Sequence, residues 1–297
     1  MLCMRYVVGY TNTPQGADAL ALAARLARSR GADLDLVLVL DREERNQLVP
    51  TSPGFNLYKH QLAESWLVQA IATLPAGIEA RHHVVYAESF SEGLILAAEE
   101  LNVRAIIVGA GGGIFGRFSV GSVANALLHS SPVPVALAPA GFAETADPNA
   151  VLTRVTAAIG LRAGAQNVLN AAVNLAGTAK IPLRLLSVVA LDAPEGAEDP
   201  EAQARAHAHA EAVQAGAREA LPADIEVTTE IVTGKRIEDA VLSVEWDPNE
   251  IVLVGSSRLA RPAHLFIGST ASKMLRELPV PMSVVPRDSV LSQGAGS

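Results

Sequence analysis

One pattern occurs twice in this chain, about 147 residues apart, and it constrains the fold more than any other feature. In each copy an apolar segment ending in glycine is followed by a Gly-Ser pair and then by Pro-Val-Pro. The copies occupy residues 105–135 and residues 251–282. Solenoid repeats have periods of about 20–50 residues, so this period is the size of a whole domain. The pattern predicts two copies of one fold.

The length and composition agree with two globular domains. The chain has 297 residues, of which 49% are hydrophobic and 18% are charged, and such a chain can bury two cores of ordinary size. Residues 140–150 are mostly small or polar and include a proline, which suits a linker. We therefore predict a first domain at residues 1–142 and a second domain at residues 150–290.

Strands and helices are predicted to alternate in both halves. The predicted strands are residues 5–10, 33–40, 80–86, 105–108 and 133–138, then 155–159, 183–189, 225–232, 251–254 and 282–285. The predicted helices are residues 13–30, 57–74, 91–101 and 122–128, then 165–177, 201–221, 236–244 and 269–278. Alternation with apolar strands indicates an α/β chain of two similar doubly wound domains, each with a five-stranded parallel sheet flanked by helices. Ligands of such sheets bind at the carboxyl ends of the strands.

Composition also argues against several functional classes. The net charge of −8 is divided evenly between the halves, and neither half has a basic patch, so we expect no nucleic-acid partner. No apolar run reaches the 18 or more residues of a membrane helix, so we expect no membrane partner. The first residues lack a signal-peptide pattern, and Cys3 is the single cysteine. We therefore expect a cytoplasmic protein without an internal disulfide. The histidines and Cys3 lack metal-ligand spacing, so we expect no metal.

The glycine-rich segment after the fourth strand contains two features that favour phosphate. Gly109 and the glycines that follow it let the backbone come close to a ligand. Gly121 and Ser122 then begin a helix, and the free N–H groups of a helix start attract phosphate. A tight turn followed by an ordinary serine N-cap explains the same residues without a ligand, and both interpretations stay open here.

A GxGxxG string is also present, at Gly111, Gly113 and Gly116. A dinucleotide fingerprint follows the first strand and leads directly into a helix. This string follows the fourth predicted strand, so it is weak evidence for a dinucleotide.

The spacing of glycines, helix start and final strand resembles the universal stress protein family in its tandem two-domain form. The family signature is G-x2-G-x9-G-[ST] followed by a P-[CV]-P-V strand. In the first copy Gly109, Gly112, Gly121 and Ser122 match, although eight residues instead of nine precede Gly121. In the second copy Gly255, Gly268 and Ser269 match, and Arg258 occupies the second glycine position. The resemblance covers nearly the whole chain.

The resemblance implies a stress-response protein with ATP in the loop, because family members of the nucleotide-binding type hold ATP there. The family usually has a nucleotide-contacting Asp after the first strand, where this chain has Thr11 in the first copy and Gly160 in the second. The first site is the better preserved. Arg258 either blocks the second site or pairs with a phosphate. Arg117 either meets the far phosphates of the first site or lies on the surface.

Three functions follow from these residues. The first is a binding module that responds to adenine nucleotide, without catalytic turnover, in which ATP occupies the first domain. The alternatives are an interaction protein with degenerate pockets and a weak ATP hydrolase. The apolar last strands are predicted sheet edges that invite pairing. We therefore expect an intramolecular pseudo-dimer of the two domains, and further pairing of chains into a homodimer.

Overall fold

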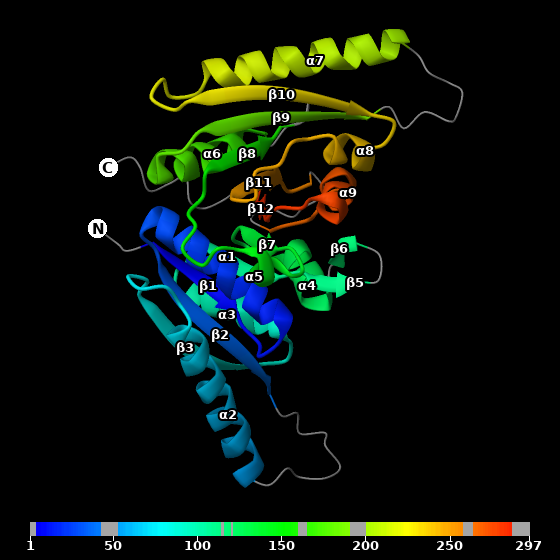
Figure 1. Cartoon of the computed structure of the whole chain (residues 1–297). Helices are drawn as coiled ribbons and strands as arrows, with labels where there is room; N and C mark the ends of the chain where they lie inside the picture. Colours follow the sequence, from blue (N-terminus) through cyan, green and yellow to red (C-terminus); the bar gives the residue numbers. More distant parts are fainter. Residues whose placement is uncertain are drawn as a thin grey trace.

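The computed structural model describes residues 4–42, 53–113, 116–119, 121–159, 165–190, 200–257 and 264–286. Within these residues the chain forms two lobes of the same design (Figure 1). Lobe 1 contains the elements from β1 to β7, and lobe 2 contains those from β8 to β12.

The strands and helices of lobe 1 alternate along the chain. They are β1 (Arg5–Gly9), α1 (Pro14–Arg30), β2 (Asp33–Asp41), α2 (Pro53–Ala72), β3 (Ala80–Ala87), α3 (Phe90–Glu100), β4 (Ala105–Gly109), the short strands β5 (Gly111–Gly113) and β6 (Gly116–Ser119), α4 (Ser122–Ser130) and β7 (Val135–Ala138). A short helix, α5 (Phe142–Thr145), follows in the segment that leads to lobe 2.

Lobe 2 repeats this order. It contains β8 (Arg154–Ala158), α6 (Ala165–Ala179), β9 (Leu183–Ala190), α7 (Pro200–Glu219), β10 (Val227–Gly234), α8 (Ile237–Leu242), β11 (Glu250–Gly255), α9 (Ser269–Glu277) and β12 (Met282–Val285). The predicted α/β alternation is therefore confirmed in both halves.

Both lobes contribute to one ten-stranded sheet with the order β10-β9-β8-β11-β12-β7-β4-β1-β2-β3. The five strands within each lobe are parallel to one another. The lobes meet where β12 pairs antiparallel with β7, with Ser283 opposite Ala136. The strand order reverses between β1 and β4 in lobe 1 and between β8 and β11 in lobe 2, which are the places where doubly wound sheets bind ligands.

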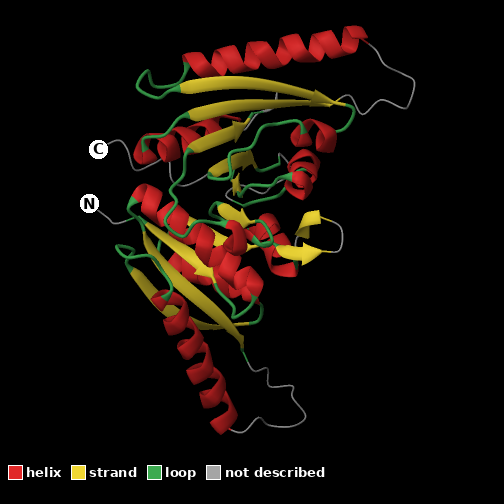
Figure 2. Ribbon diagram, in the orientation of Figure 1, coloured by secondary structure: helices red, strands yellow, loops and turns green. Residues whose placement is uncertain are grey.

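Helices cover both faces of this sheet (Figure 2). Buried residues of α1, α2 and α6 pack on one face, together with inward positions such as Tyr6 and Val8. Residues of α3, α4, α8 and α9 pack on the other face, against Val7 and its neighbours. Because adjacent strand residues point to opposite faces, a strand in such a sheet is apolar on both sides. This explains the uninterrupted apolar runs in the sequence.

Helix α1 shows how local sequence sets the elements that position the site. Thr13 is its N-cap, and its side-chain oxygen accepts a hydrogen bond from Gly16 N–H at 3.4 Å. Pro14 is the first helical residue, where its missing N–H has no consequence. Gly31 ends the helix in the left-handed conformation at φ 63°, which glycine adopts without steric cost.

The structure differs from the sequence-based expectation in four places. Helix α2 begins at Pro53 rather than at residue 57, and α8 is shorter than residues 236–244. Part of the predicted glycine loop is a hairpin, in which β5 pairs antiparallel with β6. The predicted linker contains α5, which a flexible linker would not form.

Helix α5 forms because lobe 1 supplies the hydrogen bonds that its first turn needs. The buried carboxylate of Asp18, on α1, accepts N–H bonds from Gly141 at 3.0 Å and from Ala143 at 2.8 Å. The buried Arg25 guanidinium lies 4.6 Å from the centroid of the Phe142 ring and donates to the Pro248 carbonyl of lobe 2 at 2.9 Å. The connection between the lobes is therefore anchored to α1.

Candidate functional site

The carboxyl ends of β1 and β4 meet the first turn of α1 in lobe 1. A Cβ atom at Gly109 would lie 2.1 Å from the Gln15 carbonyl oxygen, and one at Gly16 would lie 1.8 Å from the Thr11 carbonyl oxygen. Both contacts are with backbone atoms, so no side chain can be accommodated at either position. The hydroxyl oxygens of Thr11 and Thr13 are 2.8 Å apart. Thr11 therefore belongs to the turn that carries the chain from β1 into α1.

The segment after Gly109 returns through the β5–β6 hairpin to the start of α4. Gly121 is the N-cap of α4, and a Cβ atom there would lie 3.9 Å from Gly111 N. Among the described residues no side chain caps this helix. Ser122 is the first helical residue and is exposed. The ordinary serine N-cap considered from the sequence is therefore wrong, because glycine holds that position and has no side chain to cap the first turn.

The described part of lobe 2 also places a glycine N-cap at its fourth helix, and a serine makes a further contact nearby. Ser256 follows Gly255 and is buried. Its hydroxyl accepts a hydrogen bond from Phe266 N–H at 2.8 Å and lies 3.2 Å from the Phe266 carbonyl oxygen. Gly268 is the N-cap of α9, again without a side-chain cap in the described part of the chain, and Ser269 is exposed. Sequence reasoning missed Ser256, although a polar residue directly after a buried strand was a usable signal.

The predicted site residues fall into three groups. The structure brings four of them to the carboxyl edge of lobe 1, namely Thr11, Gly109, Gly121 and Ser122. Three others occupy the equivalent places in lobe 2, namely Gly255, Gly268 and Ser269. Gly112 lies on β5 and Arg117 lies on β6, while Gly160 and Arg258 lie outside the described residues.

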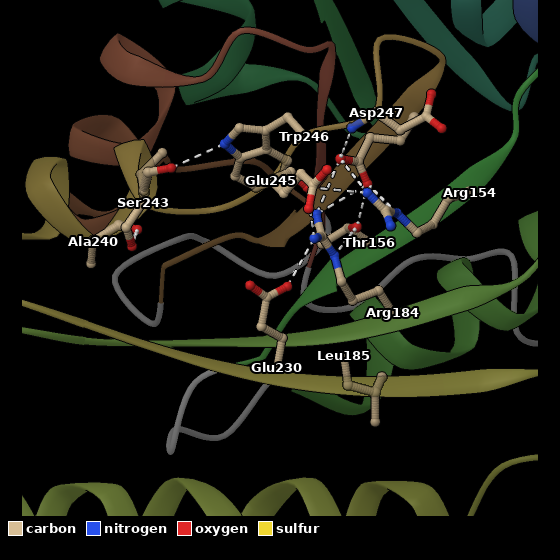
Figure 3. A network of polar contacts seen from close by, with 12 residues as sticks. Arg154, Thr156, Arg184, Leu185, Glu230, Ala240, Ser243, Glu245, Trp246 and Asp247 are labelled. Atoms are coloured by element: carbon tan, nitrogen blue, oxygen red, sulfur yellow. Dashed lines mark hydrogen bonds and ion pairs between the residues drawn. The ribbon is translucent and has the colours of Figure 1, made fainter.

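A second polar cluster lies at the opposite, amino end of the lobe 2 strands (Figure 3). The Glu250 carboxylate has no exposed surface, and it accepts hydrogen bonds from Arg154, Arg184 and Thr156, the last at 2.7 Å. Arg184 also donates to Glu230 at 2.8 Å, and its guanidinium lies 4.9 Å from the centroid of the Trp246 ring. The hydrogen bond to Glu250 raises the pKa of Arg154.

A groove of about 610 Å³ opens beside this cluster, between β10 and the segment around Trp246. Its walls include Arg154, Arg184 and Glu230. Arg184 directs all three of its nitrogens to acceptors of this lobe, so its hydrogen-bonding capacity is used within the fold. Doubly wound sheets bind ligands at the carboxyl ends of their strands, whereas this groove lies at the amino ends. We therefore regard the cluster as structural.

Lobe 1 has its own buried charge at the same level of the sheet. Asp35 on β2 has no exposed surface. Its Oδ1 accepts a hydrogen bond from Arg5 at 2.6 Å and lies 2.9 Å from His83 Nε2. His83 and Asp35 are 48 positions apart in the chain, so their contact could not be inferred from spacing.

The strand registers show that the two clusters occupy equivalent positions with different charges. Asp35 lies opposite Val7 on the first strand of its lobe, and Arg184 lies opposite Thr156 on the first strand of lobe 2. On the first strands, Val7 lies two residues beyond Arg5, and Thr156 lies two residues beyond Arg154. The acid is thus supplied by the second strand in lobe 1 and by β11 in lobe 2. The buried charges of these two clusters have the partners that desolvation requires, and each cluster finds them within its own lobe.

The pKa of Asp35 makes the stability of lobe 1 depend on pH. Burial raises this pKa, but hydrogen bonds from His83 and Arg5 outweigh burial and hold it below its ordinary value. Such a carboxyl contributes stability above its unfolded pKa of about 4, and the contribution is lost as the pH falls through the folded pKa. We expect Asp35→Asn to lower the free energy of unfolding by about 1.5–3 kcal/mol at pH 7, and this difference from wild type to shrink below pH 4.

Urea unfolding at pH 7 and pH 3, followed by Trp66 fluorescence in a Trp246→Phe background, measures this effect. Asp33→Asn is the matched control on the same strand, because Arg81 lies 3.8 Å from Asp33 and is largely exposed. Such pairs contribute less than about 1 kcal/mol. Equal losses in the two variants, or a loss at Asp35 that grows toward pH 3, would contradict the assignment.

Among the residues that the structure describes, no three His, Cys, Asp or Glu side chains converge in a way that could hold a metal ion. The described helices also include none with the length and apolar character needed to cross a bilayer.

Comparison with known proteins gives consistent matches over both lobes. The sequence profile of the universal stress protein family matches residues 4–139 and residues 152–286. The universal stress protein Rv2319c of Mycobacterium tuberculosis is 31% identical over 298 residues, which cover 95% of this chain and 100% of that protein. A protein of Mycobacterium bovis, universal stress protein Mb2346c, matches to the same extent.

Solved structures share the fold over nearly the whole chain. A universal stress protein from Archaeoglobus fulgidus has a TM-score of 0.63 at 21% identity, and the match covers 95% of this chain and 98% of that one. The protein PA1789 from Pseudomonas aeruginosa has a TM-score of 0.58 at 18% identity, covering 98% and 95%. The repeated motif, the two similar lobes and these matches agree, and the chain belongs to the universal stress protein family, with two copies of its domain in one polypeptide.

Proposed function

We propose that this protein is a stress-response module that binds adenine nucleotide, with ATP held by the segment from Gly109 to Ser122 in lobe 1. One observation carries the proposal. At the carboxyl edge of the sheet, a glycine-lined segment leads back to a helix whose first turn is left without a side-chain cap in the described structure.

The electrostatics of this helix start favour a phosphate group. The first N–H groups of a helix have no partner within the helix, and the helix dipole adds about half a positive charge there. Asn125 N–H bonds to the Gly121 carbonyl, so within the described residues the donors left for a ligand are those of the first turn. The N-cap has no side chain to occupy them, and a bound anion takes that place.

We propose binding without turnover. Acid–base catalysis needs a titratable side chain within hydrogen-bond reach of the reacting group. The described residues around this segment offer backbone groups and the hydroxyls of Thr11 and Ser122. These groups position a ligand, but none of them titrates near neutral pH.

A specific observation favours the second candidate, an interaction protein with degenerate pockets. Gly109 is required by its contact with the Gln15 carbonyl whether or not a ligand binds. Packing alone therefore explains why one position of the motif is glycine. Nucleotide binding is supported by Gly121 instead. A Cβ atom there would meet no atom of the described residues closer than 3.9 Å, so these residues impose no comparable packing demand.

Lobe 2 is proposed as the weaker site, with Arg258 filling the place of the second glycine. The proposed domains remain residues 1–142 and 150–290, and we propose that they act as an intramolecular pseudo-dimer. The antiparallel pairing of β7 with β12 supports this arrangement. Formation of a homodimer of chains is a separate proposal, which light scattering on a size-exclusion column tests.

Calorimetric titration with ATP, ADP and AMP tests the site. Ser122→Glu places a negative charge where phosphate is proposed to sit, and we expect it to weaken ATP binding at least tenfold, or about 1.4 kcal/mol. Because acidic residues suit a helix start, the variant should not lose stability.

Ser122→Gln, which has similar size and no charge, is the matched control and should bind ATP as wild type does. Ser269→Glu in lobe 2 should leave the first site intact. The absence of both heat and a melting shift at millimolar ATP would remove nucleotide from the function.

A further inference from the structure

Helix α4 lies between the proposed phosphate site of lobe 1 and the loop of lobe 2 that precedes α9. At its amino end are Gly121 and Ser122. At its carboxyl end, the Leu128 carbonyl accepts a hydrogen bond from Ile267 N–H at 3.1 Å, and the Ser131 carbonyl accepts one from Leu265 N–H at 2.9 Å. Both donors belong to lobe 2, so the last turn of α4 holds a loop of the other lobe.

Side chains strengthen the same contact. The rings of His129 and Phe266 meet edge to face with their centroids 4.8 Å apart, an arrangement that adds to the energy of burial. Leu265 is 1% exposed. The Ser256 hydroxyl holds the Phe266 backbone on the other side. Residues 264–268 are therefore fixed between α4 and the end of β11.

The reverse contact is also present. Strand β6, from the glycine-rich segment of lobe 1, packs against α9, the helix that begins the candidate site of lobe 2 (Figure 1). Each candidate loop thus lies against the fourth helix of the other lobe.

A helix of nine residues is marginal in isolation, and its order depends on what each end contacts. An anion at its amino end stabilises the helical form by completing the first turn and opposing the dipole. A better-ordered α4 presents the Leu128 and Ser131 carbonyls more persistently to their donors. We infer that α4 couples anion occupancy in lobe 1 to the conformation of residues 264–268 in lobe 2.

The inference rests on the proposed function for the identity of the natural ligand. The coupling through α4 itself needs only a negative charge at the helix start. Through this coupling, a ligand bound in lobe 1 changes the conformation of lobe 2, even if Arg258 prevents lobe 2 from binding ATP. Because linkage is reciprocal, loosening the loop from α4 must change ATP affinity in lobe 1 by the same factor by which ATP stabilises the contact.

Amide hydrogen exchange of Leu265 and Ile267, resolved by NMR, measures the coupling directly. Without nucleotide, we expect these two amides to be about two- to fivefold better protected in the Ser122→Glu variant than in the Ser122→Gln variant. The glutamate supplies a fixed negative charge at the helix start. Ser122→Lys should lower this protection. The Val155 amide, which bonds to the Pro182 carbonyl, is the internal control and should not respond.

ATP added to the wild-type chain should have the same effect on the two amides as the glutamate. Phe266→Ala should abolish the response, and Phe266→Leu, which keeps an apolar side chain of similar size, should retain most of it. If ATP binds and neither ATP nor the charge series changes these amides, the coupling is wrong and the nucleotide site stands. If ATP fails to bind but the charge series acts, the proposed function is wrong and the coupling stands.

Discussion

Glutamine in place of Glu250 is expected to lower the free energy of unfolding of lobe 2 by about 3–5 kcal/mol. The variant keeps the size of the side chain and removes its charge. Arg184 has only 5% of its side chain exposed, so it cannot recover the lost interaction from water. Arg154 loses the same partner. Removal of one member of a buried ion pair leaves a desolvated charge, which is why the effect is large.

Urea unfolding followed by Trp246 fluorescence in a Trp66→Phe background reports lobe 2 separately. Glu245→Gln is the matched control, because Glu245 is exposed and contributes its backbone carbonyl to Arg184. It should change stability by no more than about 0.5 kcal/mol. A loss below about 1 kcal/mol for Glu250→Gln would show that the cluster is not held by this charge.

The second large effect is expected at Gly109. Alanine at this position places a Cβ atom 2.1 Å from the Gln15 carbonyl oxygen, so α1 and β4 must separate. Overpacking of a core usually costs about 1–3 kcal/mol, and here the obstacle is backbone that cannot change rotamer. We therefore expect a loss of at least about 3 kcal/mol in lobe 1.

Unfolding followed by the fluorescence of Trp66 in lobe 1 and Trp246 in lobe 2 measures the loss at Gly109 and its contrast. Gly216→Ala provides the contrast, since a Cβ atom there has no neighbour within 4 Å among the described residues. That helical substitution should stabilise the chain by about 0.5–1 kcal/mol. A Gly109→Ala chain as stable as wild type would mean that the approach of α1 to β4 is not required.

The two predictions separate architecture from ligand binding. Gly109 and Glu250 are explained by contacts within the fold, and neither needs a ligand. Ser122 makes no such contact with the described residues and is exposed at a helix start, so a charge placed there tests binding without testing stability. Because of this difference, nucleotide binding can be tested at Ser122 without disturbing the folding of the lobes.

Much of the fold could be predicted because the relevant signals are local. The apolar runs that become β1 and β4 are buried on both faces, and their composition shows it directly. The start of α1 was predicted from Thr13 and Pro14, since capping acts within one turn. The first four elements of each lobe recur in the same order, and the duplicated motif alone predicts two similar lobes.

The candidate site was only partly predictable. The glycine motif indicated the carboxyl edge of the sheet, and Gly121 and Gly268 do begin the fourth helices. The sequence favoured a continuous loop, where the structure has a hairpin that packs on α9. No local pattern shows that Gly109 lies against Gln15, because the two residues meet only when α1 packs on β4.

The sequence alone determined the order of strands and helices, the presence of two copies and the positions of the two glycine motifs. These features follow from the spacing of apolar residues and glycines, which acts over a few neighbours. Tertiary structure alone decided three other features. They are the pairing of Asp35 with His83, the burial of Glu250 between two arginines and the hydrogen bonds between α4 and the lobe 2 loop. These partners are brought together by strand register and by the β7–β12 junction, and desolvation makes their contacts strong only once the sheet is complete.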